Sequence, residues 1–412
     1  MANALETMDL IAKESLVIAK NEMVMLDRID RQHSSEFSND TGDSIRIRKR
    51  TRYEAVDGAD VTGQIRDITQ GTTTLTLDKF KSVPVALTST DLTLELDDFN
   101  KSITEPAMIE LCQQVESDIA ELYKQVYWFT GTAGSTPSTL TDINAMRETL
   151  TNAGVPAADR TAFYTPSAMT QLSDGLKGVF PTGIATRAIE ASSIGRYALF
   201  QDVVESVSLV NHIVGDYGGT PLVNGAGQET TYEATRNTGS QALVTDGWTA
   251  SKTGLLTEGD VFEIDGVFAV NPKTRQSTGS LQTFVVRASA DSDGAGNSTL
   301  TISPAIITSG AFQSVFVVGG TVPDNAAITV VSGAALNQYP QNLGLHRDAF
   351  TVAFANLVEP MGGARSARET MDNVSVRVVY DYDSLTDTNI IRYDVLYGVL
   401  AQNPQFAVRQ TG

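Results

Sequence analysis

At 412 residues, with 41% hydrophobic and 19% charged residues, the chain has the composition of a folded globular protein rather than a disordered or membrane-spanning one. Its net charge of −19 disfavours a sequence-specific reader of nucleic acid, because such proteins bind phosphates with clustered Lys and Arg. Cys112 is the only cysteine, so an intrachain disulfide is excluded. With only three histidines besides, the chain offers few ligands for a transition metal. We expect no cofactor, no metal site and no membrane partner.

Residues 4–30 predict a helix with apolar side chains on several sides, and such a helix must be covered on several sides. Charged residues interrupt the start of this segment, so we expect no secretory signal and a protein that acts where it is made. The segment is either a core helix or an arm that packs on another copy, and the polar stretch 33–42 favours the arm slightly. As an arm, its candidate contact residues are Met8, Ile11 and Ile18.

A basic strand follows in the sequence SIRIRKRTRY, which starts at Ser44. Period-two alternation predicts that four arginines share one face of this strand, namely Arg46, Arg48, Arg50 and Arg52. That face is either solvated or a contact for an acidic partner, most simply another copy of the chain. Residues 74–87 alternate cleanly as well, so 45–88 predict a long two-stranded excursion, which is poorly stable unless it lies on another surface.

Residues 104–129 give the strongest helical pattern, with apolar residues at three- and four-residue spacing and Pro106 in the first turn. About 26 residues at 1.5 Å each predict a helix of roughly 39 Å. Shorter helices are predicted near 141–153, from about 166, and near 184–193, with a short strand, TAFY, between the first two. The fold class is therefore α+β.

From residue 217 the chain becomes rich in Gly, Thr, Ser and Val, with short strands about every ten residues. This pattern is typical of a small β-barrel or sandwich and lasts to residue 344. Mixed patterning and three further strands follow from 345. A β module is thus predicted to be inserted into an α+β domain.

Motifs that carry catalysis are missing from the sequence, which has no phosphate loop, HExxH zinc motif or GxSxG nucleophile elbow. DSDGAGNSTL (291–300) offers carboxylates for calcium, but Ile302 replaces the bidentate glutamate of an EF-hand, so a hairpin turn is the simpler interpretation. His33, His212 and His346 lie far apart in sequence and are interpreted as structural or solvated. We expect a structural protein rather than an enzyme.

Three segments resemble the major capsid proteins of tailed phages with the Hong Kong 97 fold, most of all the coat proteins of short-tailed Salmonella phages, which carry a telokin-like insertion domain. They are LLTEGDVFEIDGVFAV (255–270), NLGLHRDAFTVAFANLVEP (342–360) and YGVLAQNP (397–404). The matching residues are Gly259, Asp260, Gly266, Val267, Asp348, Ala349, Tyr397, Gly398, Val399, Ala401 and Pro404. Residues 1–200 resemble the family by pattern only.

The resemblance implies a domain scheme: an N-terminal arm (1–40), an extended β loop with flanking strands (41–101), a peripheral domain with a spine helix (102–200), an apical domain with closing strands (201–216 and 345–412), and an inserted β-barrel domain (217–344). It also implies a major capsid protein that assembles in the host bacterial cytoplasm, as hexamers and pentamers, into an icosahedral procapsid and then an expanded head. Its expected partners are a scaffolding protein, a portal protein and enclosed double-stranded DNA, which it does not bind sequence-specifically.

Two other functions stay open at this stage. An encapsulin-like nanocompartment shares the fold, although the inserted β module argues against it. A multidomain carbohydrate-binding protein would use the β module to hold a sugar, but only two tryptophans, Trp128 and Trp248, are available as stacking platforms.

Overall fold

The computed structural model describes residues 11–19, 23–37, 42–55, 67–88, 103–175, 194–360 and 365–412. Helices and strands alternate irregularly along the chain, so the predicted α+β class is confirmed. The chain divides into two compact units, and each is formed from segments that lie far apart in sequence. Within the described residues, no helix is both long and apolar enough to cross a membrane.

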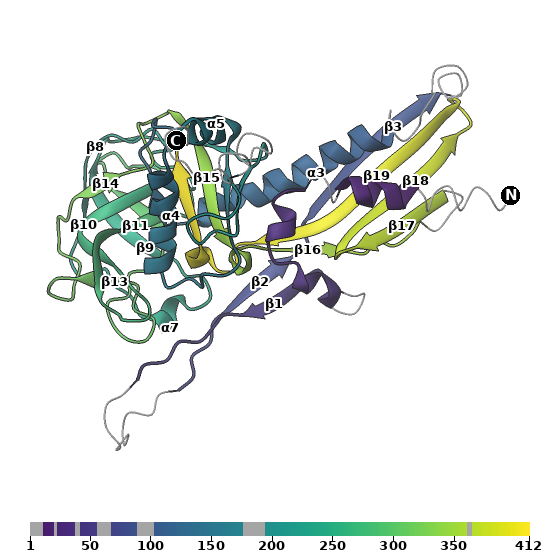
Figure 1. Cartoon of the computed structure of the whole chain (residues 1–412). Coiled ribbons are helices and arrows are strands. Elements are labelled where there is room, and N and C mark those ends of the chain that lie inside the picture. The colour runs from purple at the N-terminus through teal and green to yellow at the C-terminus, as the bar shows by residue number, and fades with distance from the viewer. Residues whose placement is uncertain are drawn as a thin grey trace. The chain divides into compact units, whose positions relative to one another are not determined.

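Unit 1 comprises residues 1–46, 74–120 and 350–400. Its five-stranded antiparallel sheet has the order β16-β19-β18-β17, with β3 paired to β19 (Figure 1). The strands are β3 (Lys79–Thr88), β16 (Thr351–Ala355), β17 (Arg365–Met371), β18 (Val374–Asp383) and β19 (Thr388–Leu400). Residues 11–19 are helical, followed by the 3-10 turns η1 (Leu26–Arg28) and η2 (Gln32–Glu36).

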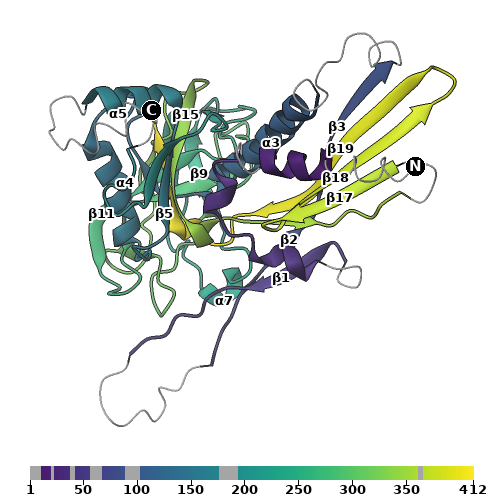
Figure 2. The same cartoon turned by 45° about the vertical axis from the view of Figure 1, so that its right-hand side comes forward.

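The long helix α3 (Glu105–Ala120) lies along one face of this sheet, as both views show (Figures 1 and 2). Its apolar stripe, which includes Met108 and Val115, is fully buried. Strand register places every second residue of β19 on the helix side, and Tyr393 and Tyr397 of that set are buried. Their hydroxyls reach polar partners, Thr104 and Asp118, so that these tyrosines bury rings without leaving a hydroxyl unpaired.

Unit 2 comprises residues 47–73, 121–349 and 401–412. One of its sheets has the order β4-β20-β15-β5-β6, with β7 paired to β15. The strands are β4 (Phe129–Thr130), β5 (Arg160–Tyr164), β6 (Asp202–Glu205), β7 (Asn211–Ile213), β15 (Gln338–His346) and β20 (Ala407–Thr411). The remaining elements around this sheet are η4 (Glu121–Gln125), α4 (Leu140–Asn152), α5 (Pro166–Gly175), η6 (Arg347–Ala349) and η7 (Pro404–Phe406).

The second sheet of unit 2 curls into a small barrel (Figure 1). Strands pair in the order β10-β11-β12-β9-β8, and β14 pairs with β10 and bridges to β8 through Leu222 and Ala327, which closes the ring. Its elements are β8 (Gly219–Val223), α7 (Tyr232–Thr235), β9 (Gln241–Trp248), β10 (Val261–Val270), β11 (Ser277–Val286), β12 (Ser298–Ser303), β13 (Val315–Val317) and β14 (Ile328–Val330). Phe262 and Phe284 stack in its interior and are fully buried.

Several predicted elements are confirmed and others are wrong. Helices near 141–153 and from 166 are confirmed as α4 and α5, while the one near 184–193 lies outside the described residues. The helix predicted over 4–30 is wrong at its end, because residue 23 is not helical and a 3-10 turn follows. The helix predicted over 104–129 is too long, because the α-helix gives way at Glu121 to a 3-10 turn. In this turn the Tyr123 hydroxyl forms a hydrogen bond with buried His212.

The predicted two-stranded excursion is also shorter than expected. Its strands are β1 (Ser44–Arg48) and β2 (Thr72–Thr76), which pair only with each other among the described strands. The alternating residues 79–88 belong instead to β3, which pairs with β19 over its full length. An alternating pattern is the same in a free ribbon and in a sheet edge, so the sequence alone does not distinguish them.

Candidate functional site

The exposed face of β1 carries Arg46 and Arg48. They alternate with Ile45 and Ile47, which are each only 8% exposed, so one face of this strand is covered and the other is open. In the part of the chain that the structure describes, neither arginine side chain makes an ion pair or a hydrogen bond. Two fixed positive charges therefore point outward from a chain whose net charge is −19.

Arg50 and Arg52 do not continue that face. The strand ends at Arg48, and Arg50 turns to Asp348, with 2.5 Å between Nη2 and Oδ2. The Arg50 guanidinium also lies over the Phe406 ring, and that of Arg52 lies over the Phe312 ring. Arg46 and Arg48 are thus exposed without a partner among the described residues, whereas Arg50, although also exposed, and Arg52 contact their own chain.

The N-terminal candidates divide in a similar way. Met8 lies outside the described residues, whereas Ile11 and Ile18 are half-buried on the helix 11–19. The face of this helix that carries Ala12 and Leu16 is buried. Farther along, the amide N–H of Met25 donates to Oε1 of Glu116 in α3 at 2.6 Å, which fixes the segment within unit 1.

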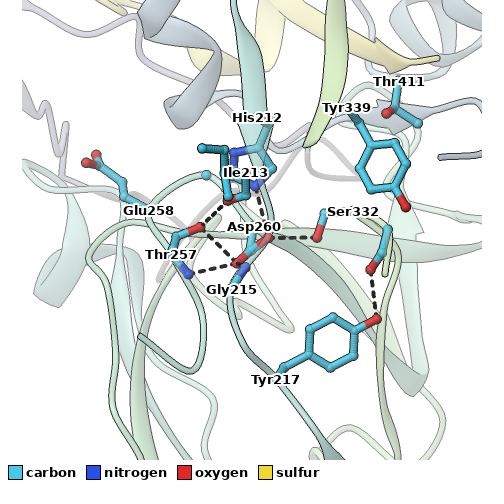
Figure 3. A network of polar contacts seen from close by, with 12 residues as sticks. His212, Ile213, Gly215, Tyr217, Thr257, Glu258, Asp260, Ser332, Tyr339 and Thr411 are labelled. Carbon is cyan, nitrogen blue, oxygen red and sulfur yellow. Dashed lines mark hydrogen bonds and ion pairs between the residues drawn. The ribbon is translucent and has the colours of Figure 1, made fainter. Parts of the chain in front are cut away.

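A buried polar cluster lies where the chain enters and leaves the barrel (Figure 3). Asp260, at the start of β10, is fully buried, and its Oδ1 accepts from Nε2 of His212 at 2.9 Å and from Oγ of Ser332 at 2.8 Å. Its Oδ2 accepts from the amide N–H groups of Gly215 (3.0 Å) and Thr257 (2.7 Å). We call these five residues the clasp, because they join the strand before the barrel, the barrel itself and the returning segment.

Two residues from outside the barrel, Tyr123 and Arg409, pack beside the clasp. The Tyr123 hydroxyl lies 2.9 Å from Nδ1 of His212. Arg409, on the C-terminal strand β20, donates to the carbonyl of Gly259 and stacks over the rings of Tyr123 and Phe129. A buried cation thus lies beside the buried carboxylate, which offsets part of the cost of removing both charges from water.

The electrostatics favour an ionised Asp260. Burial alone would raise the pKa of this carboxyl, but the hydrogen bond and charge of His212 and the N–H donors of Thr257 and Gly215 outweigh burial, and the pKa falls below its ordinary value. Burial raises the pKa of Tyr123 to about 12 and lowers the pKa of Arg409 to about 10. At neutral pH the tyrosine is therefore neutral and the arginine charged.

The clasp contains Ser, His and Asp, yet its geometry does not match an acyl-transfer triad. Ser332 donates to Asp260 rather than to His212, so no base is placed to activate the serine hydroxyl. His212 and Ser332 are also at most 2% exposed, so a substrate could not reach either group. The arrangement is suited to holding chain segments together.

Other sequence candidates occupy ordinary structural positions. Asp293 closes the turn between β11 and β12 by accepting from the amide N–H groups of Ala295 and Asn297, as a hairpin turn requires. Within the described ranges, no cluster of His, Cys, Asp or Glu has the spacing of a metal site. Cys112 is buried on α3, and His33 lies 2.7 Å from a carboxylate oxygen of Glu36.

The motif residues behind the capsid resemblance have definite structural roles. Gly398 lies under the chain at Thr76, where an added Cβ would be 2.0 Å from the Thr76 carbonyl oxygen. Asp348 pairs with Arg50, and its carbonyl accepts from Nδ2 of Asn403. Sequence reasoning singled out Asp260 only through its motif and did not find Arg409 or Ser332, since no local pattern marks residues that meet only in the folded chain.

Several solved structures are similar to this chain at low sequence identity. The chain is similar to a Mycobacterium phage Che8 structure with a TM-score of 0.48 and 12% identity, covering 94% of this chain and 90% of that one. It is similar to the capsid of Ralstonia phage GP4 with a TM-score of 0.47 and 10% identity, covering 93% and 86%. A virus-like particle from Pyrococcus furiosus gives a TM-score of 0.40 and 8% identity, covering 98% and 99%.

No curated protein matches the sequence. The family model described as "P22 coat protein - gene protein 5" matches residues 1–412. The order of elements (ribbon, long helix, interrupted sheets and inserted barrel) is consistent with the Hong Kong 97 type of fold. Because the family match spans the whole chain, this protein belongs to the P22 coat protein family and is a phage major capsid protein, part of the icosahedral shell of the virion.

Proposed function

We propose that copies of this coat protein join through the exposed basic face of β1, where Arg46 and Arg48 meet acidic side chains of a neighbouring copy. The observation that carries this proposal is the outward position of these two arginines, without a partner in the described chain. With 49 acidic and 30 basic residues, a second copy carries an excess of carboxylates over cationic groups. Exposed ion pairs contribute only about 0–1 kcal/mol each, so the contact gains strength from repetition around a closed shell.

In this proposal the four arginines of the segment 46–52 have two different roles. Arg50 is engaged with Asp348 and Arg52 with Phe312, so both hold the ribbon to its own subunit and serve a neighbour only indirectly. Met8, Ile11 and Ile18 are proposed as apolar contacts of the N-terminal arm with scaffolding protein or with a neighbouring copy. The arm's charged residues and half-buried isoleucines suit a surface that is covered on assembly.

The remaining partners follow from the capsid role. We infer that hexamers and pentamers of the chain close around scaffolding protein with a portal at one vertex, and later enclose double-stranded DNA. A chain with a net charge of −19 repels phosphates on average, so DNA is contained without sequence-specific binding. The five-part domain scheme given by the sequence is retained as part of this proposal.

A charge-reversal experiment tests the basic face. Arg46→Glu with Arg48→Glu should leave the thermal melt followed by circular dichroism unchanged, because both side chains are exposed. In assembly reactions with scaffolding protein, the double variant should stay as unassembled subunits in a sucrose gradient, while the unmodified chain sediments as shells. Lys273→Glu with Arg365→Glu changes the charge equally at two other exposed positions and should still form shells. Normal shells from the Arg46/Arg48 variant would contradict the proposal.

A further inference from the structure

Strands β1 and β2 form a two-stranded ribbon, and the segments that follow β1 and lead into β2 lie against the inserted barrel. We call residues 49–54 and 70–72 the ribbon root. Nζ of Lys49 donates to the carbonyl oxygens of Arg236 and Asn237, at 3.0 Å each, just after helix α7. The amide N–H of Thr72, on the other segment of the root, donates to Oδ1 of Asn237 at 3.0 Å. One short stretch of the barrel therefore holds both segments of the root, and both views place α7 beside them (Figures 1 and 2).

Two more parts of the barrel contact the same root. The guanidinium of Arg52 lies 5.9 Å from the centroid of the Phe312 ring, which itself stacks on Tyr232 with centroids 3.5 Å apart. Glu54 forms an ion pair with Arg275 at 2.8 Å. Contacts from α7, from the segment near Phe312 and from the β10–β11 turn converge on one place. The barrel thus presents a formed surface to the ribbon root. We call the contacts between this surface and the root the seat.

The seat is packed closely as well as charged. A Cβ added at Gly71 would lie 2.2 Å from the carbonyl oxygen of Arg236, so the two backbones touch where only glycine fits. Lys49 is half-buried, and burial, and secondarily the charge of Arg287, lower the pKa of its ammonium group. Inside the root, Lys49 donates its amide N–H to Gly71 at 2.8 Å and couples the two segments.

We propose that the inserted barrel fixes the direction of the ribbon, so that the barrel acts in assembly by positioning Arg46 and Arg48 for a neighbouring copy. The proposal rests on the function proposed above, in which that basic face joins copies. A two-stranded ribbon has little stability by itself and needs a support to keep one direction. The seat holds the segments directly after β1 and directly before β2, so it fixes the end of the ribbon next to Arg48.

Two single substitutions weaken the contacts of the seat without changing a residue of the clasp or of the barrel core. Gly71→Ala forces the root away from Arg236, and Lys49→Met removes the ammonium group while keeping the chain length. In each variant the thermal melt should stay close to that of the unmodified chain. Hydrogen exchange at the amide of Thr72, which bonds to Asn237, should accelerate at least tenfold. Gly294→Ala, at a glycine with open space around it, is the matched control and should change neither.

Assembly gives the second readout. Both seat variants should form at least tenfold fewer shells than the Gly294→Ala control under the same conditions. Thr72→Cys with Asn237→Cys, oxidised to a disulfide, should restore shell formation to a chain that also carries Lys49→Met. Fast exchange with normal shell yield would overturn the proposal, as would a cross-linked seat that blocks assembly. If the unmodified chain forms no shells, the proposed function fails instead, and unchanged exchange in the variants would still disprove the seat.

Discussion

Nε2 of His212 lies 2.9 Å from Oδ1 of Asp260, and this contact joins β7, which precedes the barrel, to the residue directly before β10 of the barrel. Ser332, on the returning segment, bonds to the same oxygen. One carboxylate therefore holds both crossings of the chain between the barrel and its neighbouring sheet. This buried charge and its donors thus help to hold the barrel in place.

Replacing that charge should destabilise unit 2. Asp260→Asn keeps the size of the side chain but turns one acceptor into an N–H group that faces existing donors, and it leaves Arg409 without its nearby anion. Removing one partner of a buried charged pair costs roughly 3–5 kcal/mol, so we expect a loss of about 3 kcal/mol in the free energy of unfolding. Chemical denaturation followed by tryptophan fluorescence measures this, because Trp248 is buried in the barrel core.

Asp293→Asn provides the control, since Asp293 lies in an exposed turn. It should unfold at the same denaturant concentration as the unmodified chain. Equal midpoints for the Asp260 and Asp293 variants would mean that the clasp contributes nothing to stability.

The clasp also predicts a specific acid sensitivity. The folded-state pKa of Asp260 lies below its ordinary value of 3.8, so its contribution is fully present above that value and is lost as the pH falls through the folded-state pKa. The stability difference between the unmodified chain and Asp260→Asn should therefore be constant near neutral pH and shrink below about pH 4. Urea midpoints measured from pH 7 to pH 3 test this, and a difference that grows on acidification would contradict the lowered pKa.

Much of the fold could be predicted because it follows local patterns. The apolar stripe of α3 buries one face of that helix, and alternating valines of β18, such as Val376 and Val378, lie in the core. Burial of one face produces its own periodicity. The change of composition near residue 217 anticipated a β-rich region for the same reason. Membership in the coat protein family supports the capsid hypothesis over the nanocompartment and carbohydrate-binding alternatives.

The candidate site was predicted less well, because its contacts join distant parts of the chain. Arg46 and Arg50 look equivalent by spacing, yet only Arg50 has Asp348 within reach, 298 residues away. The clasp brings residues 212, 260 and 332 together, with residue 409 beside them, and no window of sequence contains all four. Local periodicity reports which face is covered and not which side chain covers it.

The close crossing at Gly398 gives a backbone test within unit 1. Gly398→Ala would place a methyl group 2.0 Å from the carbonyl oxygen of Thr76, and its nearest neighbours are all backbone atoms of Thr76 and Leu77, which cannot rotate away as a side chain could. Overpacking of this kind costs about 1–3 kcal/mol, and a thermal melt should show the loss. Gly294→Ala is again the control, and a Gly398→Ala chain as stable as that control would mean that the chain near Thr76 moves aside freely.

The N-terminal segment should matter for folding as well as for any contact between copies. Glu116 is buried on α3 and accepts the amide N–H of Met25, so Glu116→Ala leaves that donor unsatisfied. Hydrogen bonds to charged groups contribute about 1.5–3 kcal/mol, and we expect a loss of that size in unit 1. Glu110→Ala, at an exposed position on the same helix, should have a much smaller effect. Deletion of residues 1–30 should likewise lower the melting temperature, and an unchanged melt would make the segment a pure assembly arm.

The barrel should fold when residues 217–344 are expressed alone, because every member of its apolar core, from Tyr217 to Val330, lies inside that fragment. His212, Gly215 and Arg409 are absent from it, so Asp260 loses three of its neighbours. Asp260→Asn should then cost clearly less free energy in the fragment than in the whole chain, because the coupling between the carboxylate and the absent groups is already gone. Denaturation of the whole chain, the fragment and the Asp260→Asn variant of each gives this comparison directly. An equal cost in both would show that the carboxylate serves the barrel itself, and a collapsed, poorly dispersed NMR spectrum of the fragment would show that the barrel depends on the sheet that carries β20.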